Sequence, residues 1–172
     1  MSKKSIPTHI DPFRFAELSL NVEGSLCIAD MTRLGVNVVP DDSIVTVNLQ
    51  FGLDDQGITY LIGNLKTALT LLCQRCMKPF TYEIISKFEL GIVKTLDEAN
   101  ALSANYEPAI AKEGMLALKE LIEDEIILNL PLVPRHDPES CELKLPLADS
   151  GWEQEKNKNP FQVLESLKHK QR

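Results

Sequence analysis

Hydrophobic and polar residues alternate along residues 43–51, whose sequence is SIVTVNLQF. A period of two places successive side chains on opposite faces of an extended chain, so this pattern predicts a strand that is buried on one side. The apolar positions that share its buried face are Val45, Val47, Leu49 and Phe51. The segment LDDQG at 53–57 follows directly and predicts a hairpin turn.

Three further runs, at 58–62, 65–73 and 80–90, have strand-like composition. The first two are separated by Gly63 and Asn64, a pair that suits a tight reversal, so we expect two short strands joined by a turn there. The third run has apolar side chains at spacings of two. Together with residues 43–51, these runs predict an antiparallel sheet with short connections.

Two shorter segments precede these strands. The sequence AELSLNV at 16–22 alternates and predicts another strand. The sequence ADMTRLG at 29–35 has Asp30 near its start, where a carboxylate can cap a helix, and predicts one or two helical turns.

Residues 114–131 show the spacing of an amphipathic helix. Leu118, Leu121 and Ile122 fall on one side of it. The acidic residues expected on the opposite, solvated side are Glu120, Glu123 and Asp124. Pro131 cannot continue a helix, so we expect the helix to end there.

Glu125 falls on the apolar side of the same helix. A carboxylate in that position needs a hydrogen-bond donor or a countercharge. It is therefore a rim carboxylate, a carboxylate bonded to a backbone amide, or a buried partner of Arg75 or Arg135.

These elements predict an α+β fold, in which an antiparallel meander of about five or six strands packs with one main amphipathic helix. We expect residues 1–143 to form a single domain. The segment at 144–158 is polar and rich in turn-forming residues, which indicates a flexible linker. At 159–172, Asn159 as N-cap and Pro160 at the first helical position predict a short basic helix that docks on its own sheet or on a partner.

Composition and charge narrow the class of protein. The chain has 172 residues, of which 44% are hydrophobic and 25% charged, and no apolar run is long enough to cross a bilayer. We therefore expect a cytoplasmic protein with no membrane partner. The net charge is −7, with −10 carried by 97–155, +3 by 66–94 and +4 by 156–172. Contacts with RNA would have to use these local basic patches.

The stretch LLCQRCMKPF at 71–80 contains a Cys-x-x-Cys pair, Cys73 and Cys76. A redox pair of the thioredoxin kind needs a helix N-terminus to lower the thiol pKa, whereas this pair lies between two strand-like runs. A zinc site needs two more ligands, which His136 and Cys141 in RHDPESC can supply. The third interpretation is that these thiols only pack or remain exposed, and Cys27 is expected in the core.

No catalytic constellation is found in the sequence. The eight glycines form no phosphate-binding loop, and no histidine has the spacing of a nucleophile–base pair. The EDE run in the helix is expected to be a solvated face rather than an acid and base pair. We therefore expect a protein that is not an enzyme and has no small-molecule substrate.

Three motifs together resemble a known family. The stretches CQRCMKPF, EDEIILNLPLVPRHDPESC and NPFQVLESLKHK, in this order and spacing, are similar to the large ribosomal RNA subunit accumulation proteins of the YceD family. In this resemblance, Cys73, Arg75 and Cys76 fall on the family's CxRC motif. The resemblance implies a bacterial cytoplasmic ribosome-biogenesis factor, required for synthesis, processing or stability of 23S rRNA, and it brings no catalytic residue.

Two ways of acting on rRNA remain open. In the first, the hairpin contacts large-subunit rRNA or its precursor directly, because cationic side chains at a turn suit phosphate or an exposed base. The RNA-binding candidates are Arg75, Lys78, Lys66 and Lys87. In the second, the protein is an adaptor that recruits a ribosomal protein, a pre-ribosomal particle or an rRNA-processing factor.

Overall fold

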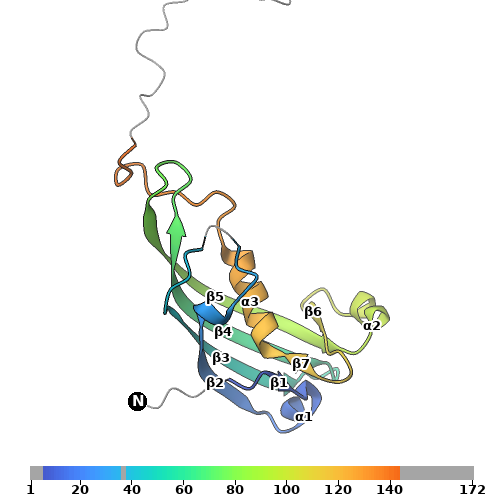
Figure 1. Cartoon of the computed structure of the whole chain (residues 1–172). Helices are drawn as coiled ribbons and strands as arrows, with labels where there is room; N and C mark the ends of the chain where they lie inside the picture. The colour runs from blue at the N-terminus through green and yellow to red at the C-terminus, as the bar shows by residue number, and fades with distance from the viewer. Residues whose placement is uncertain (1–5, 36–37, 144–172) are drawn as a thin grey trace, which may run out of the picture. The chain divides into compact units, whose positions relative to one another are not determined.

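The computed structural model describes residues 6–35 and 38–143 (Figure 1). The chain divides into two units, Met1–Cys141 and Glu142–Arg172. The predicted linker at 144–158 and the predicted helix at 159–172 lie outside the described residues. The division into a domain and a tail at residue 143 stays a prediction.

A five-stranded sheet forms the body of the first unit. Its spatial order is β2-β3-β4-β5-β6, so each strand lies beside its neighbour in the sequence. Pairing is antiparallel except between β5 and β6, which run parallel. The strands are β2 (Asn21–Cys27), β3 (Ile44–Leu53), β4 (Thr59–Leu72), β5 (Pro79–Val93) and β6 (Glu107–Ile110). The expected α+β class with a mostly antiparallel sheet is confirmed.

Shorter elements complete the described part of the chain. The strands β1 (His9–Ile10) and β7 (Leu116–Ala117) form a separate two-stranded ladder. The remaining elements are the helix α1 (Pro12–Glu17), the 3-10 turn η1 (Ile28–Asp30), the helix α2 (Leu96–Ala101) and the longest described helix, α3 (Leu118–Asn129). In the part of the chain that the structure describes, no helix has the length and apolar character needed to cross a membrane.

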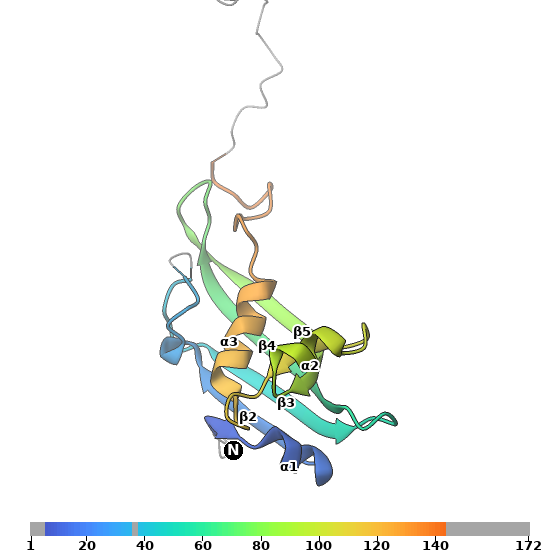
Figure 2. The same cartoon turned by 90° about the vertical axis from the view of Figure 1, so that its right-hand side faces the viewer.

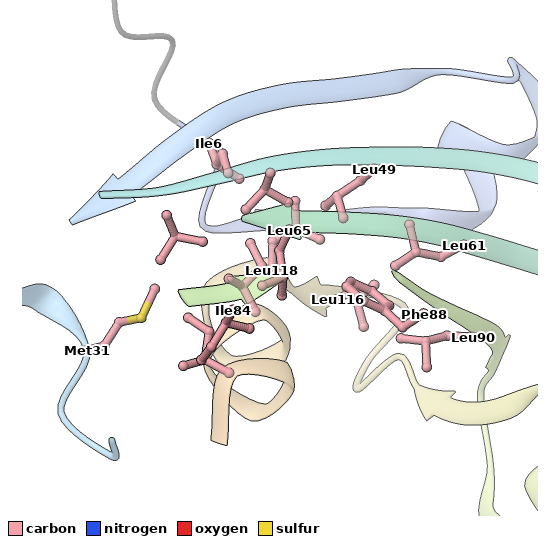
Figure 3. Close-up of a cluster of buried hydrophobic side chains, with 14 of the residues drawn as sticks. Ile6, Met31, Leu49, Leu61, Leu65, Ile84, Phe88, Leu90, Leu116 and Leu118 are labelled. Atoms are coloured by element: carbon pink, nitrogen blue, oxygen red, sulfur yellow. The ribbon is translucent and has the colours of Figure 1, made fainter. Parts of the chain in front are cut away.

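The helix α3 lies across one face of the sheet, as both views show (Figures 1 and 2). The apolar stripe of α3 consists of Leu118, Ile122 and Ile126, which are fully buried. Figure 3 shows Leu118 among side chains from the inner face of the sheet, including Leu65 and Ile84. Burying a side chain of this size contributes about 1.5–3 kcal/mol relative to exposure, so these three residues stabilise the contact of α3 with the sheet.

The turn expected at Gly63 and Asn64 does not exist, because β4 runs unbroken through both residues. A Cβ atom on Gly63 would lie 2.0 Å from the Cζ atom of Phe88 on the neighbouring strand. Phe88 is directly opposite Gly63 in the register, and its ring occupies the space above it. Glycine is therefore needed here for a close approach between strands and not for a reversal.

Two other local expectations were wrong. The segment expected as a strand at 16–22 begins inside α1, whose start is capped by the carboxylate of Asp11, and the strand β2 begins only at Asn21. The helix expected at 29–35 is reduced to the single 3-10 turn η1. The pairing of β2 with β3 begins at Asn21 and ends at Cys27. In the segment after η1, the backbone N–H of Arg33 donates to the Glu123 carboxylate instead of to a helical carbonyl.

The acidic side of α3 is not simply solvated, as we had expected. Only 3% of Glu123 is exposed, and Arg33 donates to it from its backbone N–H and from Nε, the latter at 3.1 Å. Arg33 Nη1 donates to Asp124 at 2.6 Å, and Nη2 donates to the Glu120 carbonyl at 2.8 Å. One arginine from the loop after η1 thus fixes that loop to the helix.

Candidate metal centre

The turn between β4 and β5 positions the Cys-x-x-Cys pair. The backbone N–H of Cys73 donates to the Lys78 carbonyl at 2.9 Å, and that of Met77 donates to the Cys73 carbonyl at 2.8 Å. Met77 takes a left-handed conformation with φ of 58°, which closes the turn. The backbone N–H of Arg75 points at the Sγ atom of Cys73, 3.4 Å away. The local backbone therefore directs hydrogen-bond donors at the first sulfur.

The segment that follows α3 returns to this turn, as Figures 1 and 2 both show. The backbone N–H of Gln74 donates to the Pro134 carbonyl at 2.8 Å, and Pro134 is fully buried. Two residues later, the backbone N–H of His136 points at Cys73 Sγ at 3.5 Å, and the imidazole lies 5.0 Å from the ring of Phe80. The hydrogen bond between Gln74 and Pro134 thus brings His136 next to Cys76, sixty positions earlier in the chain.

Four potential ligands converge at this place: Cys73, Cys76, His136 and Cys141. Their ligand atoms all lie within 4.8 Å of one another. Cys76 Sγ and His136 Nδ1 are 3.3 Å apart, and Cys73 and Cys141 are almost completely buried. The structure thus brings together all four residues that the sequence proposed as metal ligands.

The hydrogen bonds of the cluster change the acidity of its thiols. Burial opposes ionisation of Cys73, but the backbone N–H groups of His136, Cys76 and Arg75 and the His136 side chain outweigh it and lower the pKa of the thiol to about 5. For Cys76, the backbone N–H of Lys78 favours the thiolate. Burial and the neighbouring sulfurs outweigh that donor and raise the pKa of Cys76. Ionisation of one thiol therefore opposes ionisation of its neighbours, and a bound cation would relieve this repulsion.

The donor set fits zinc. Three sulfurs and one imidazole are the ligands of a closed, tetrahedral structural site, and a divalent cation would stabilise the thiolates that otherwise repel one another. The redox interpretation needs a helix N-terminus at Cys73, and the structure has a turn between two strands there. Cys27 is half-buried at the end of β2 and is not part of the cluster.

Arg75 supports the cluster from outside the ligand set. Its Nε donates to Cys141 Sγ at 3.0 Å, while its Nη2 atom is buried and has no hydrogen-bond partner among the described residues. A guanidinium held in this way orients and neutralises a sulfur ligand. No local sequence signal reveals this contact, because it joins residues 66 positions apart.

The remaining basic candidates are spread over the sheet. Lys66 is exposed on β4, and Lys87 on β5 pairs with Glu89, Nζ to Oε1, at 3.4 Å. Lys78 is exposed at the turn. Lys94, part of the same basic segment, lies over the ring of Phe13 at 4.7 Å from its centroid. The structure brings the sulfur ligands together but does not gather these cations into one cluster.

The fold and the site define a small α+β protein whose Cys₃His cluster joins a β-hairpin to the segment after its main helix. The chain belongs to the YceD family, described as large ribosomal RNA subunit accumulation protein YceD, whose match covers residues 61–168 and so contains all four ligands. A relative from Haemophilus influenzae, named large ribosomal RNA subunit accumulation protein YceD, is 35% identical over 99% of this chain and 100% of its own length. No solved structure is significantly similar to this chain.

Proposed function

We propose that this protein is a non-enzymatic factor in the bacterial cytoplasm that supports accumulation of large-subunit rRNA. The observation that carries the proposal is the Cys₃His cluster, because it lies inside the part of the chain that matches a family named for this role. In this proposal, Cys73, Cys76, His136 and Cys141 hold a zinc ion. The zinc has a structural role, since it fixes the hairpin to the returning segment.

The hairpin then presents its basic side chains to large-subunit rRNA or its precursor. Lys66 lies opposite Ile85 in the register of β4 and β5, so Lys66 and Lys87 are diagonal neighbours on the solvent face of the sheet. Lys78 adds a third exposed cation at the turn. Arg75 contributes mainly by holding Cys141 in place, which makes it a weaker candidate for direct RNA contact than the lysines.

An adaptor role is the second candidate, and one observation favours it. Glu83 and Glu89 lie on the same face of β5 as Lys87, and Lys66 is on the neighbouring strand. The two carboxylates therefore balance the charge of the two lysines on this face. A balanced face attracts phosphate less than a basic one does. The adaptor would act on rRNA through a ribosomal protein or a processing factor.

The proposal is tested by depleting the protein in its host and measuring the ratio of large-subunit to small-subunit rRNA, with precursor ends mapped. Complementation uses the native chain, Lys66→Ala with Lys87→Ala, Cys73→Ser, and the control Lys112→Ala with Lys119→Ala, which changes the same charge away from the hairpin. We expect depletion to lower the large-subunit rRNA selectively and the native chain and control to restore it.

The outcomes separate the parts of the proposal. Failure of Cys73→Ser alone would support the zinc-dependent hairpin and point to the adaptor. Failure of the lysine variant, with weaker and less salt-sensitive binding to rRNA fragments, would support direct contact. An unchanged rRNA ratio after depletion would reject the role in rRNA accumulation.

A further inference from the structure

A cavity of about 430 Å³ lies at the other end of α3 from Leu118, between that helix, β5 and the segment before β6. Three carboxylates line it: Glu89, Glu107 and Glu125. Phe88 and Leu128 form apolar walls beside them. The cavity is separate from the sulfur cluster, with which it shares no residue, and we call it the Glu125 pocket.

Glu125 is the unusual member of this set. Only 8% of it is exposed, yet its carboxylate has no hydrogen-bond or ion-pair partner among residues 6–35 and 38–143. The expected pairing with Arg75 or Arg135 does not occur, since Arg75 bonds to Cys141 instead. Glu125 lines the pocket, so a cation that enters the pocket can supply the missing countercharge.

Three nearby carboxylates have a countercharge, unlike Glu125. Arg33 neutralises Glu123 and Asp124 on the other side of α3, and Lys87 pairs with Glu89 at the pocket. Burial, and then the charges of Glu107 and Asp124, raise the pKa of Glu125. The pocket lining carries three carboxylates and one lysine, so it is negatively charged and can accept a further cation.

The residues that line the pocket favour one kind of cation. Among the described residues, the only group of three or more acidic, histidine or cysteine side chains that could hold a metal ion is the Cys₃His cluster, so the three pocket carboxylates do not form a metal site of that kind. A cationic head on a flexible aliphatic stem fits better, because the head can reach Glu125 while the stem packs on Leu128 and Phe88. Leu128 is 74% exposed, which leaves an apolar surface at the entrance.

We propose that the Glu125 pocket binds a lysine or arginine side chain from an extended segment of a basic protein. The chemistry excludes RNA as the ligand, because phosphate would be repelled by carboxylates that have only one lysine beside them. That the segment belongs to a protein of the assembling large subunit rests on the proposed function. That the pocket binds a basic side chain is argued only from the residues that line it.

The test uses isotope-labelled full-length protein and nuclear magnetic resonance. The probes are capped peptides Gly-Ser-Xaa-Ser-Gly in which Xaa is lysine, arginine or uncharged norleucine. We expect the lysine and arginine peptides to shift the amide signals of Tyr106 and Leu128 saturably, and the norleucine peptide to bind at least fivefold more weakly. Glu125→Gln should weaken lysine-peptide binding at least fivefold.

Two further variants keep the test specific. Glu120→Gln removes the same charge from the same helix outside the pocket, and it should change the affinity less than twofold. Lys87→Gln removes the competing cation and should tighten binding of the lysine peptide, whereas direct RNA contact through Lys87 predicts weaker RNA binding for the same variant. Folding of each variant is checked from the unchanged signals of the sheet core.

Equal binding of the norleucine peptide would overturn the proposal, as would unchanged affinity in Glu125→Gln. A short RNA oligonucleotide that shifts the Tyr106 and Leu128 signals equally in the native protein and in Lys87→Gln would also overturn it. Because these measurements use purified protein, their failure is independent of the rRNA ratio in the host. Lysine-specific binding together with a normal rRNA ratio after depletion would support the pocket and reject the ribosomal origin of the segment.

Discussion

The two ends of α3 are joined to the rest of the protein in different ways. At its N-terminal end, Leu118 and Ile122 pack on the sheet in a dense apolar interface. Past its C-terminal end, Leu132 and Val133 are exposed, and the returning chain is held by Pro134 and the Cys₃His cluster. Apolar burial thus stabilises the first region, whereas directional bonds to sulfur and nitrogen hold the second.

The proposed zinc ion would act in the second region. Its bonds to the four ligands would hold the hairpin to the segment after α3, where the exposed Leu132 and Val133 contribute little apolar burial. The two regions should therefore respond differently to chelation and to changes in side-chain volume.

The largest expected effect is on the hairpin end. We expect one zinc per chain by atomic emission, and chelation or Cys73→Ser should remove it. When free zinc exceeds its dissociation constant a thousandfold, binding contributes about 4 kcal/mol to stability, which would be lost and measured as a lower unfolding temperature.

Cys27→Ser is the matched control, because it removes a thiol outside the cluster. It should leave the zinc content unchanged. Equal loss of zinc in Cys27→Ser, or full stability of Cys73→Ser in the presence of chelator, would contradict the contrast between the two regions.

The next effect concerns packing within the sheet. Gly63→Ala places a methyl group where the ring of Phe88 lies, and we expect a loss of about 1–3 kcal/mol in the free energy of unfolding by urea denaturation. Phe88→Leu in the same chain should recover part of this loss, because it removes the ring. Zinc content should remain normal in both variants, and a loss of zinc would show that the two regions are not independent.

A smaller effect is expected at Glu125, where the apolar interface contains a charge without a partner. Glu125→Gln should raise the free energy of unfolding by about 1 kcal/mol at neutral pH. Because the pKa of Glu125 is raised in the folded protein, its ionisation lowers stability as the pH rises. The gain should therefore be near zero below the ordinary pKa of 4.5 and grow as the pH rises through the raised pKa. A gain that does not depend on pH would contradict this explanation.

The smallest effect is expected at Met77, which is 68% exposed and has a left-handed backbone. Met77→Gly relieves that conformation but makes the unfolded chain more flexible, so we expect a gain below about 1 kcal/mol in thermal unfolding. Met77→Ala, which keeps a Cβ atom, should show no gain. Stabilisation of equal size in both variants would exclude the backbone as its cause.

Local patterns were sufficient where the partner of a residue is a generic apolar surface. The alternation in β3 predicted that strand and its buried face. The helical spacing predicted α3 and the burial of Leu118 and Ile122, although residues 114–117 of the expected helix lie before its start. The four potential metal ligands could also be named from the sequence. Cysteine and histidine are recognisable as metal ligands whatever their separation along the chain. These predictions need no knowledge of which residue lies opposite.

Prediction failed where the decisive partner is one particular distant residue. Gly63 was assigned to a turn because the local sequence gives no other reason for a glycine. The actual reason is the ring of Phe88, which is 25 positions away and occupies the space that a side chain would need. Glu123 was expected in solvent because nothing near it in the sequence indicates Arg33. Arg75 was expected to project from the hairpin, and its contact with Cys141 depends on the path of the chain after α3. Each case depends on tertiary contact, which periodicity does not encode.

The separation of the four ligands along the chain also has a consequence during synthesis. Cys73 and Cys76 leave the ribosome together, on a turn that β4 and β5 can form locally, whereas His136 and Cys141 emerge only after α3 has been made. Since chains fold from the N-terminus as they are translated, the sheet can form before the last two ligands are available. Capture of the proposed zinc ion would then be the closing step of folding, and it would mark a chain whose first unit is complete.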